Sequence, residues 1–296
     1  MSRRIRLFQV DAFTTERFTG NPAGVVLDAQ VLSDAEMQVL ARELGNGDTA
    51  FVLPPDDAHH DLRIRFFTPR KEAAFVGHAT LAAHAVLNRL ESRPFRLQQG
   101  QTGTVEVAAL ASGGFAIRQA PPAMGRVLAT GELEEVLAAL GISIADLDPT
   151  CPAQIIGSAS TRLLLGVTGS SVLDKVQPQH VALGNLSAAI GAQGYFLFTR
   201  HPSVAGCDTE ARMFCPAIGI DEDPVSGNAH AMLGAYLALH GLTATSGADV
   251  TFQGIQGRHV GRPGRVTVEL ELDAGAVKST RISGHAVVVF QAVLDL

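Results

Sequence analysis

The sequence predicts an α+β protein built from two related halves. Its 296 residues suit two domains of about 150 residues each better than a single hydrophobic core. Segments with the alternation of β-strands are interspersed with segments that have the helical period of about 3.6 residues. A stretch that begins at Arg65 is echoed by one that begins at Arg212. An internal echo of this kind favours duplication of one structural unit.

The first half is expected to contain two helices among several strands. Ser33 and Glu36 have capping-box spacing, and apolar residues follow them at helical positions until Gly45 ends the helix. The second helix is predicted over His78–Leu90, where alanine, valine and leucine form an apolar side. Strands are predicted at residues 5–13, 49–53, 62–67, 104–109 and 114–119.

The second half is expected to repeat this pattern after a linker at Pro121-Pro122. The predicted domains are therefore 1–120 and 121–284, with the C-terminal strand 285–296 as a candidate last strand of the first. The helix predicted over Ala229–Leu239 is apolar all round, which is typical of a helix inside a core. The other predicted helices are 132–140 and 181–190, and the predicted strands are 162–167, 194–199, 211–215, 265–272 and 286–294.

The two echoed stretches suggest an anion site. Each reads as a strand, an acidic turn containing Glu72 or Glu222-Asp223, and a Gly–polar–Ala start to an apolar helix: Gly77-His78-Ala79 and Gly227-Asn228-Ala229. A helix N-terminus leaves backbone N–H groups unpaired, and a glycine there lets an anion come close. Two such termini facing one cleft would hold a carboxylate. The plainer interpretation is that Ser226 or Asn228 caps its own helix and Gly77 only turns the chain.

Three side chains are candidates for acid–base chemistry or substrate contacts. Asp48 lies in a glycine-flanked loop before a buried strand, where partial desolvation would raise its pKa toward neutrality. His78 is suited to carry a proton or to bind a substrate group. Asp223 is placed to fix the site or to bind a hydroxyl or amine. Each also has a structural interpretation: Asp48 as a turn residue, His78 as a donor to a backbone carbonyl, and Asp223 as an acid favoured at a helix N-terminus.

Composition excludes several other classes. The net charge of −6 argues against a nucleic-acid partner, because phosphate binding needs clustered Lys and Arg. No apolar run reaches the ~18 residues of a membrane span, and the basic N-terminus has no apolar segment behind it, so a cytoplasmic protein is expected. Cys151, Cys207 and Cys215 are expected to be buried thiols. No metal site is predicted, because the histidines, including His59-His60, have no Cys or carboxylate partners at ligand spacing.

Several motifs together resemble the phenazine-biosynthesis PhzF-like proteins. They occur in order from near residue 8 to near residue 263, so the resemblance covers almost the whole chain, and the last two are the most specific. The motifs are Val10-Asp11-Ala12-Phe13, Gly20-Asn21-Pro22-Ala23-Gly24, Thr49-Ala50-Phe51-Val52, Arg65-Phe66-Phe67-Thr68-Pro69, Phe75-Val76-Gly77-His78-Ala79-Thr80 and Asp223-Pro224-Val225-Ser226-Gly227-Asn228-Ala229. The short stretches Gln256-Gly257 and Gly261-Arg262-Pro263 also fit.

The resemblance implies a diaminopimelate epimerase-like fold of two pseudo-symmetric domains, each a curled sheet around a central helix, with the active site between them. It also implies a homodimer without a metal or organic cofactor. The implied activity is a proton shift on trans-2,3-dihydro-3-hydroxyanthranilate or a similar small carboxylate. The matching catalytic positions are Asp48, His78 and Asp223, and the substrate-binding positions are Asn21, Gly77, Ser226, Gly227 and Asn228.

One position departs from the family pattern. The residue that matches the usual catalytic Glu is Asp48, which is one methylene shorter. A misplacement of about 1 Å can cost about 100-fold in rate, so either the loop compensates, the substrate differs or catalysis is weaker. Proton transfer of the epimerase or racemase type on a related acid, a non-catalytic binder of carboxylates and a scaffold that acts through its dimer interface remain alternatives. A two-thiol racemase is disfavoured, because no cysteine lies in the Gly77 or Gly227 turns.

Overall fold

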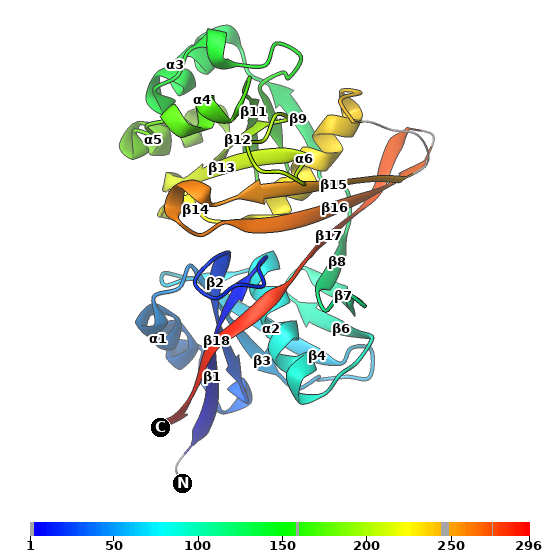
Figure 1. Cartoon of the computed structure of the whole chain (residues 1–296). Coiled ribbons are helices and arrows are strands. Elements are labelled where there is room, and N and C mark those ends of the chain that lie inside the picture. The colour runs from blue at the N-terminus through cyan, green and yellow to red at the C-terminus, as the bar shows by residue number, and fades with distance from the viewer. Residues whose placement is uncertain (1–2, 158–159, 244–248, 274) are drawn as a thin grey trace. The chain divides into compact units, whose positions relative to one another are not determined.

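The computed structural model describes residues 3–157, 160–243, 249–273 and 275–296. The chain folds into two compact units (Figure 1), of which the first comprises Met1–Gln119 and Ser283–Leu296 and the second Ala120–Ile282. Both combine strands with a few helices, which confirms the predicted α+β class. Across the described residues, no helix has the length and apolar character needed to cross a membrane.

The first unit is a sheet with one long helix against it. The sheet runs in the order β18, β1, β2, β3, β4, β6, β7, β8, and the pairs β2–β3 and β4–β6 are parallel. Helix α2 packs on β1, β2 and β3, and its alanines reach the core. The elements are β1 (Arg4–Ala12), β2 (Asn21–Leu27), η1 (Ala29–Val31), α1 (Asp34–Leu44), β3 (Asp48–Leu53), β4 (Leu62–Phe67), β5 (Glu72–Ala73), α2 (Gly77–Leu90), β6 (Phe95–Gly100), β7 (Gly103–Ala109), β8 (Phe115–Gln119) and β18 (Ala286–Asp295).

Helix α1 begins and ends where its sequence predicts. The Ser33 hydroxyl accepts from the Glu36 N–H at 3.3 Å, and the Glu36 carboxylate accepts from the Ser33 N–H at 2.8 Å, so the capping box is complete. Gly45 follows the helix with φ of 69°, in the left-handed conformation that favours glycine.

The second unit has the same plan, with the sheet order β9, β10, β11, β12, β13, β15, β16 and parallel pairs β11–β12 and β13–β15. Helix α6 is buried over most of its length, as its uniformly apolar sequence predicts. The elements are β9 (Met124–Val127), α3 (Thr130–Leu140), η2 (Ile144–Asp146), β10 (Gln154–Ile156), β11 (Arg162–Gly166), α4 (Ser170–Lys175), α5 (His180–Ile190), β12 (Tyr195–Thr199), β13 (Thr209–Cys215), η3 (Pro216–Ile218), β14 (Ile220–Asp223), α6 (Gly227–Leu239), β15 (Asp249–Gln256), η4 (Arg258–Val260), β16 (Gly264–Asp273) and β17 (Ala276–Gly284).

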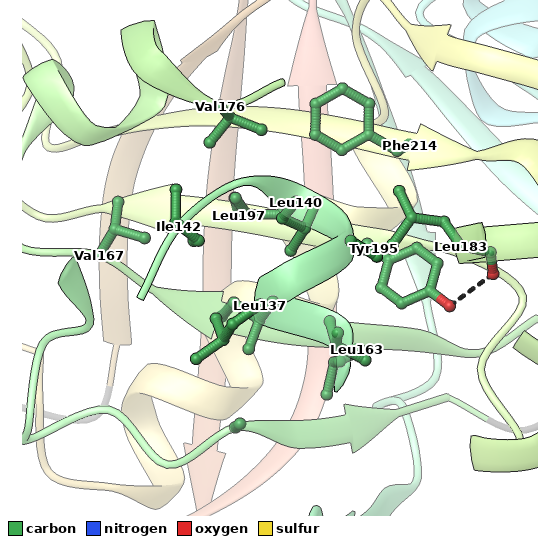
Figure 2. Packing of buried hydrophobic residues seen from close by; sticks show 14 of the residues in the cluster. Leu137, Leu140, Ile142, Leu163, Val167, Val176, Leu183, Tyr195, Leu197 and Phe214 are labelled. Carbon is green, nitrogen blue, oxygen red and sulfur yellow. Dashed lines mark hydrogen bonds between the residues drawn. The ribbon is translucent and has the colours of Figure 1, made fainter. Parts of the chain in front are cut away.

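A separate apolar cluster in the second unit joins α3 and α5 to the sheet (Figure 2). Leu137 and Leu140 from α3 and Leu183 from α5 pack with Leu163 and Tyr195 of β11 and β12. The buried Tyr195 hydroxyl donates to the Leu183 carbonyl at 2.7 Å, so its polar end is satisfied inside the cluster. This packing holds β12 in place, and β12 belongs to the same sheet as β13 and β14.

The echo in the sequence corresponds to a structural repeat. Arg65 on β4 binds Glu72 on β5 at 2.7 Å, and Arg212 on β13 binds Glu222 on β14 at 2.8 Å. Each guanidinium also lies over the phenyl ring two residues later, Phe67 or Phe214, at 5.1 and 4.9 Å from the ring centre. The prediction of acidic turns was wrong in detail, because both acids lie on short strands that pair with the preceding strand.

Candidate functional site

Asp48 is the first residue of β3 and not a loop residue, which corrects the sequence-based prediction. It pairs with Ala23 of the parallel strand β2, and only 8% of it is exposed. The connection before it is held by a reciprocal amide pair: Gln9 donates to Asn46 and Asn46 donates back, both at 2.9 Å. The position of the Asp48 backbone is therefore set by a sheet and by a side-chain pair.

His78 lies next to Asp48 although 30 residues separate them in the sequence. Its Nε2 is 3.7 Å from Asp48 Oδ2, which is beyond hydrogen-bond distance, and both side chains are nearly buried. Within the described residues, this nitrogen has no hydrogen-bond partner. Burial lowers the pKa of His78 to about 4, so the imidazole is neutral at neutral pH and the two groups do not form an ion pair. A neutral imidazole beside a carboxylate is suited to share a proton or a substrate atom with it.

The N-terminus of α2 lies at the same place. The residue before the helix is Val76, which offers no side-chain cap, while the Thr80 N–H already bonds to the Val76 carbonyl. The N–H groups of Gly77, His78 and Ala79 therefore have no acceptor within the helix. An uncapped helix start favours a bound anion. Asn21, buried at the start of β2, is two residues before the strand partner of Asp48.

The second unit gathers the other predicted residues around the start of α6. Asp223 ends β14, Ser226 immediately precedes the helix, and Gly227 and Asn228 are its first two residues. The Ser226 hydroxyl accepts from the Ala229 N–H at 3.2 Å, so the plainer interpretation is right for Ser226, which caps its own helix. Gly227 and Asn228 retain N–H groups without an acceptor in the helix.

The register of the repeat shows that the two units carry different polar groups at matching positions. Phe66 follows Arg65 and pairs with Ala73, and Met213 follows Arg212 and pairs with Asp223, so by strand register Asp223 matches Ala73 and, five residues further on, Asn228 matches His78. Asp48 in turn matches Gly194, and Ser226 matches Val76. The first unit thus carries Asp48, His78 and Gly77, whereas the second carries Asp223, Ser226, Gly227 and Asn228. The matching positions of the two units therefore hold different polar groups.

Two buried histidines, His84 and His230, and the nearly buried His78 give a prediction for pH. Burial lowers the pKa of His78, His84 and His230 to about 4, from an ordinary value near 6.5. The unfolded chain binds more protons than the folded one between these values, so stability is complete above pH 6.5 and is lost as the pH falls toward 4. At pH 5.5 each of these histidines is expected to lower the free energy of unfolding by about 1 kcal/mol.

His84→Gln tests this expectation, because glutamine can still bond to Gln98 as the imidazole does at 3.0 Å. Thermal unfolding is measured at pH 7.5 and 5.5. Between pH 7.5 and pH 5.5, the free energy of unfolding of the variant should fall by about 1 kcal/mol less than that of the wild type. An identical loss in both proteins would contradict the assignment of acid lability to buried imidazoles.

Two predictions from the sequence need correction. His60 does have carboxylate partners, because its ring nitrogens lie 3.1 Å from Asp56 and 2.9 Å from Asp57. These three residues form a compact group on the loop before β4, where both aspartates are exposed. Cys207 is only half-buried, and Arg265 Nη1 lies 2.7 Å from its sulfur, whereas Cys151 and Cys215 are buried free thiols as expected.

The sequence reasoning missed Gln9, Asn46 and Gln256, which hold the segments that carry the acids. Only Gln256 had a signal, since Gln256-Gly257 belongs to the stretch that resembles the known family. Neutral amides have no titration chemistry that would single them out in a sequence.

The chain is similar to known proteins along almost its whole length. The family model described as phenazine biosynthesis-like protein matches residues 10–292. An uncharacterized isomerase from Clostridium acetobutylicum is 39% identical over 302 residues, covering 100% of both chains. The trans-2,3-dihydro-3-hydroxyanthranilate isomerase of Pseudomonas fluorescens is 31% identical, covering 94% of this chain and 95% of that one.

Solved structures extend the likeness to the fold. The crystal structure of a Bacillus anthracis phenazine biosynthesis protein of the PhzF family is similar with a TM-score of 0.89 at 27% identity, over 99% of each chain. A solved hydroxyproline epimerase has the same fold, which confirms the epimerase-like fold expected from the resemblance.

Proposed function

Since the chain belongs to the phenazine biosynthesis-like family and is an isomerase, we propose that it moves a proton between carbons of a small carboxylate metabolite, with Asp48 as the acid–base group. The observation that carries the proposal is the position of the Asp48 carboxylate 3.7 Å from a neutral His78, beside an uncapped helix start. Proton transfer by a positioned carboxylate typically contributes about 10²–10⁴-fold to the rate.

The proposed reaction is a hydrogen shift in a conjugated acid such as trans-2,3-dihydro-3-hydroxyanthranilate, the compound named for the Pseudomonas fluorescens relative. The Asp48 carboxylate takes a proton from one carbon, and the electron pair of the broken C–H bond passes into the adjoining double bonds. The resulting Asp48 carboxylic acid then delivers that proton to a second carbon. Bonds and charges balance without an oxidant or a second substrate.

The substrate carboxylate is proposed to lie in a cleft between the units. There the N–H groups at Gly77-His78 and Gly227-Asn228 would bind it, with Asn21, Asp223 and Ser226 contacting its other polar groups. Such N–H groups favour a negative charge through the partial positive charge of a helix N-terminus. The neutral His78 would orient the group that exchanges its proton with Asp48.

A two-thiol racemase is disfavoured by the cysteines that the structure describes. Burial raises the pKa of Cys215 to about 11, so this thiol stays protonated at neutral pH and is a poor base. Its counterpart in the repeat is Thr68, so the opposed pair of thiols that such a reaction needs is not formed at these positions.

Incubation of the protein with trans-2,3-dihydro-3-hydroxyanthranilate in deuterated buffer tests the function. A product that has gained one deuteron on carbon, detected by mass spectrometry and NMR, is the expected result. Binding by calorimetry without label would support the non-catalytic binder instead. Deuterium at a carbon with inversion of configuration would favour the epimerase alternative, and absence of both binding and label would refute this substrate class.

A further inference from the structure

We propose that Gln256 is a positioning residue that fixes the start of α6 for substrate binding; this inference rests on the proposed function. Gln256 lies at the end of β15, and only 1% of it is exposed. Its amide donates from Nε2 to the Asp223 carbonyl at 2.7 Å and accepts at Oε1 from the Ser226 N–H at 3.0 Å. One side chain thus spans both ends of the turn between β14 and α6.

The glutamine is itself held rigidly. Its backbone lies between two strands, pairing with Ala211 of β13 and with Gly264 of β16. The next residue, Gly257, has φ of 89°, and a Cβ there would lie 2.7 Å from the Pro224 carbonyl oxygen. The backbone after β15 therefore lies in close contact with the turn between β14 and α6, to which the Gln256 side chain is also bonded. Both contacts restrict where Asp223 and the first N–H groups of α6 can lie.

The repeat offers an internal comparison. In the first unit β6 pairs with β4 as β15 pairs with β13, and by this register Gly100 takes the place of Gln256. Gly100 has no side chain, so the turn from Ala73 to the start of α2 has no corresponding amide. The helix caps differ between the units in the same way: Val76 provides no side-chain cap for α2, whereas Ser226 caps α6. The α6 start is thus the more rigidly built of the two.

A rigid start to α6 matters for binding more than for proton transfer. Its N–H groups would contact the carboxylate equally in the ground state and the transition state, which is uniform binding. Loosening such contacts raises KM with little change in kcat. Because Asp223 is held by the same amide, some loss of kcat is also expected, but the proton itself moves at Asp48.

The test compares Gln256→Leu with Gln154→Leu in the full chain. Gln154 is a matched control, since it is also a buried glutamine of the second unit with two bonds, to the Gly125 carbonyl and to His240 at the other end of α6. Both variants lose two buried hydrogen bonds of similar geometry. For Gln256→Leu, we expect kcat/KM for trans-2,3-dihydro-3-hydroxyanthranilate to fall by about tenfold or more, mostly through KM. For Gln154→Leu, a change below about threefold is expected.

Hydrogen exchange supplies a readout that does not need turnover. Peptides covering residues 225–230 should exchange about tenfold faster in Gln256→Leu than in Gln154→Leu, with similar exchange in the core strands. If the wild type shows no turnover, the proposed function fails, and the exchange rates still decide the positioning role. Unchanged exchange of this segment in Gln256→Leu, or an equal rise of KM in both variants, would overturn the proposal.

Discussion

Asp48→Asn is expected to abolish deuterium incorporation while leaving ligand binding largely intact. The amide keeps the size of the carboxylate and its place at the start of β3, but it cannot accept and return a proton. Loss of the acid–base group should reduce the rate by about 10²–10⁴-fold. The rate is measured by mass spectrometry in deuterated buffer, and the Kd for trans-2,3-dihydro-3-hydroxyanthranilate is measured by calorimetry.

Asp148→Asn is the control for removal of a nearly buried carboxylate. The Asp148 oxygens are occupied by Thr150 at 2.6 Å and by Arg200 at 2.7 Å, so this group serves the fold of the second unit. Its loss should lower the melting temperature but keep the rate within a few-fold of the wild type. An Asp48→Asn protein that still exchanges deuterium at the wild-type rate would show that another group moves the proton.

Asp48→Glu separates the explanations for the shorter acid. The added methylene gives the carboxylate a longer reach from β3, where the shorter acid ends 3.7 Å from His78. If the chain acts on a different acid, the longer residue should raise turnover of trans-2,3-dihydro-3-hydroxyanthranilate by about tenfold or more. If Asp48→Glu turns over no faster than the wild type, β3 already brings the Asp48 carboxylate close enough to the substrate.

The helices that position the site were predictable because local signals agree with the final packing. The capping box at Ser33 and the apolar periodicity of α1 and α2 survive in the structure almost to the residue. Strand β2 was not predicted, because Pro22 and Gly24 read as turn formers. Gly24 fits the strand for a reason that the sequence does not show. A Cβ at this position would lie only 2.8 Å from Thr49 Oγ1 on the neighbouring strand, so the close approach of the two strands favours glycine.

Strand β6 was missed because its polarity is inverted. Arg96 and Gln98 are buried, whereas Phe95 is exposed, so the expected alternation of apolar and polar faces is absent. The burial of Gln98 depends on its bond to His84 in α2, a partner 14 residues earlier. A polar residue that finds such a partner contradicts a prediction based on hydrophobicity.

The residues of the candidate site are proposed from sequence motifs, but the sequence did not predict how they lie relative to one another. The family motifs identify Asp48 and His78, yet their proximity depends on the parallel pairing of β2 and β3 and on the position of α2. The role of Ser226 as a cap and the bonds of Gln256 depend on contacts between segments that are distant in the sequence. Spacing along the chain contains no information about these contacts.

Arg212→Met is expected to destabilise the second unit by about 3–5 kcal/mol. Arg212 is nearly buried and binds Glu222 through two nitrogens, at 3.0 and 2.8 Å. Its Nη1 also donates to the carbonyls of Leu173 and Val176, so it joins α4 to β13 and β14. Methionine fills the volume but leaves a largely buried carboxylate and two carbonyls without this donor. The measurement is calorimetric thermal unfolding together with urea denaturation of the full chain.

The repeat supplies the matched control, Arg65→Met. The side chains of Arg65 and Glu72 are 28% and 25% exposed, against 8% and 12% for Arg212 and Glu222, so water can solvate the carboxylate that remains. A loss of only about 1 kcal/mol is expected there. In the double variant Arg212→Met with Glu222→Leu, the part of the loss that comes from the unpaired carboxylate should be recovered, whereas the Leu173 and Val176 carbonyls stay without this donor. Equal losses from Arg65→Met and Arg212→Met would show that desolvation does not set the strength of these pairs. The duplicated ion pair would then contribute through its geometry, which the two units share, and not through its burial, in which they differ.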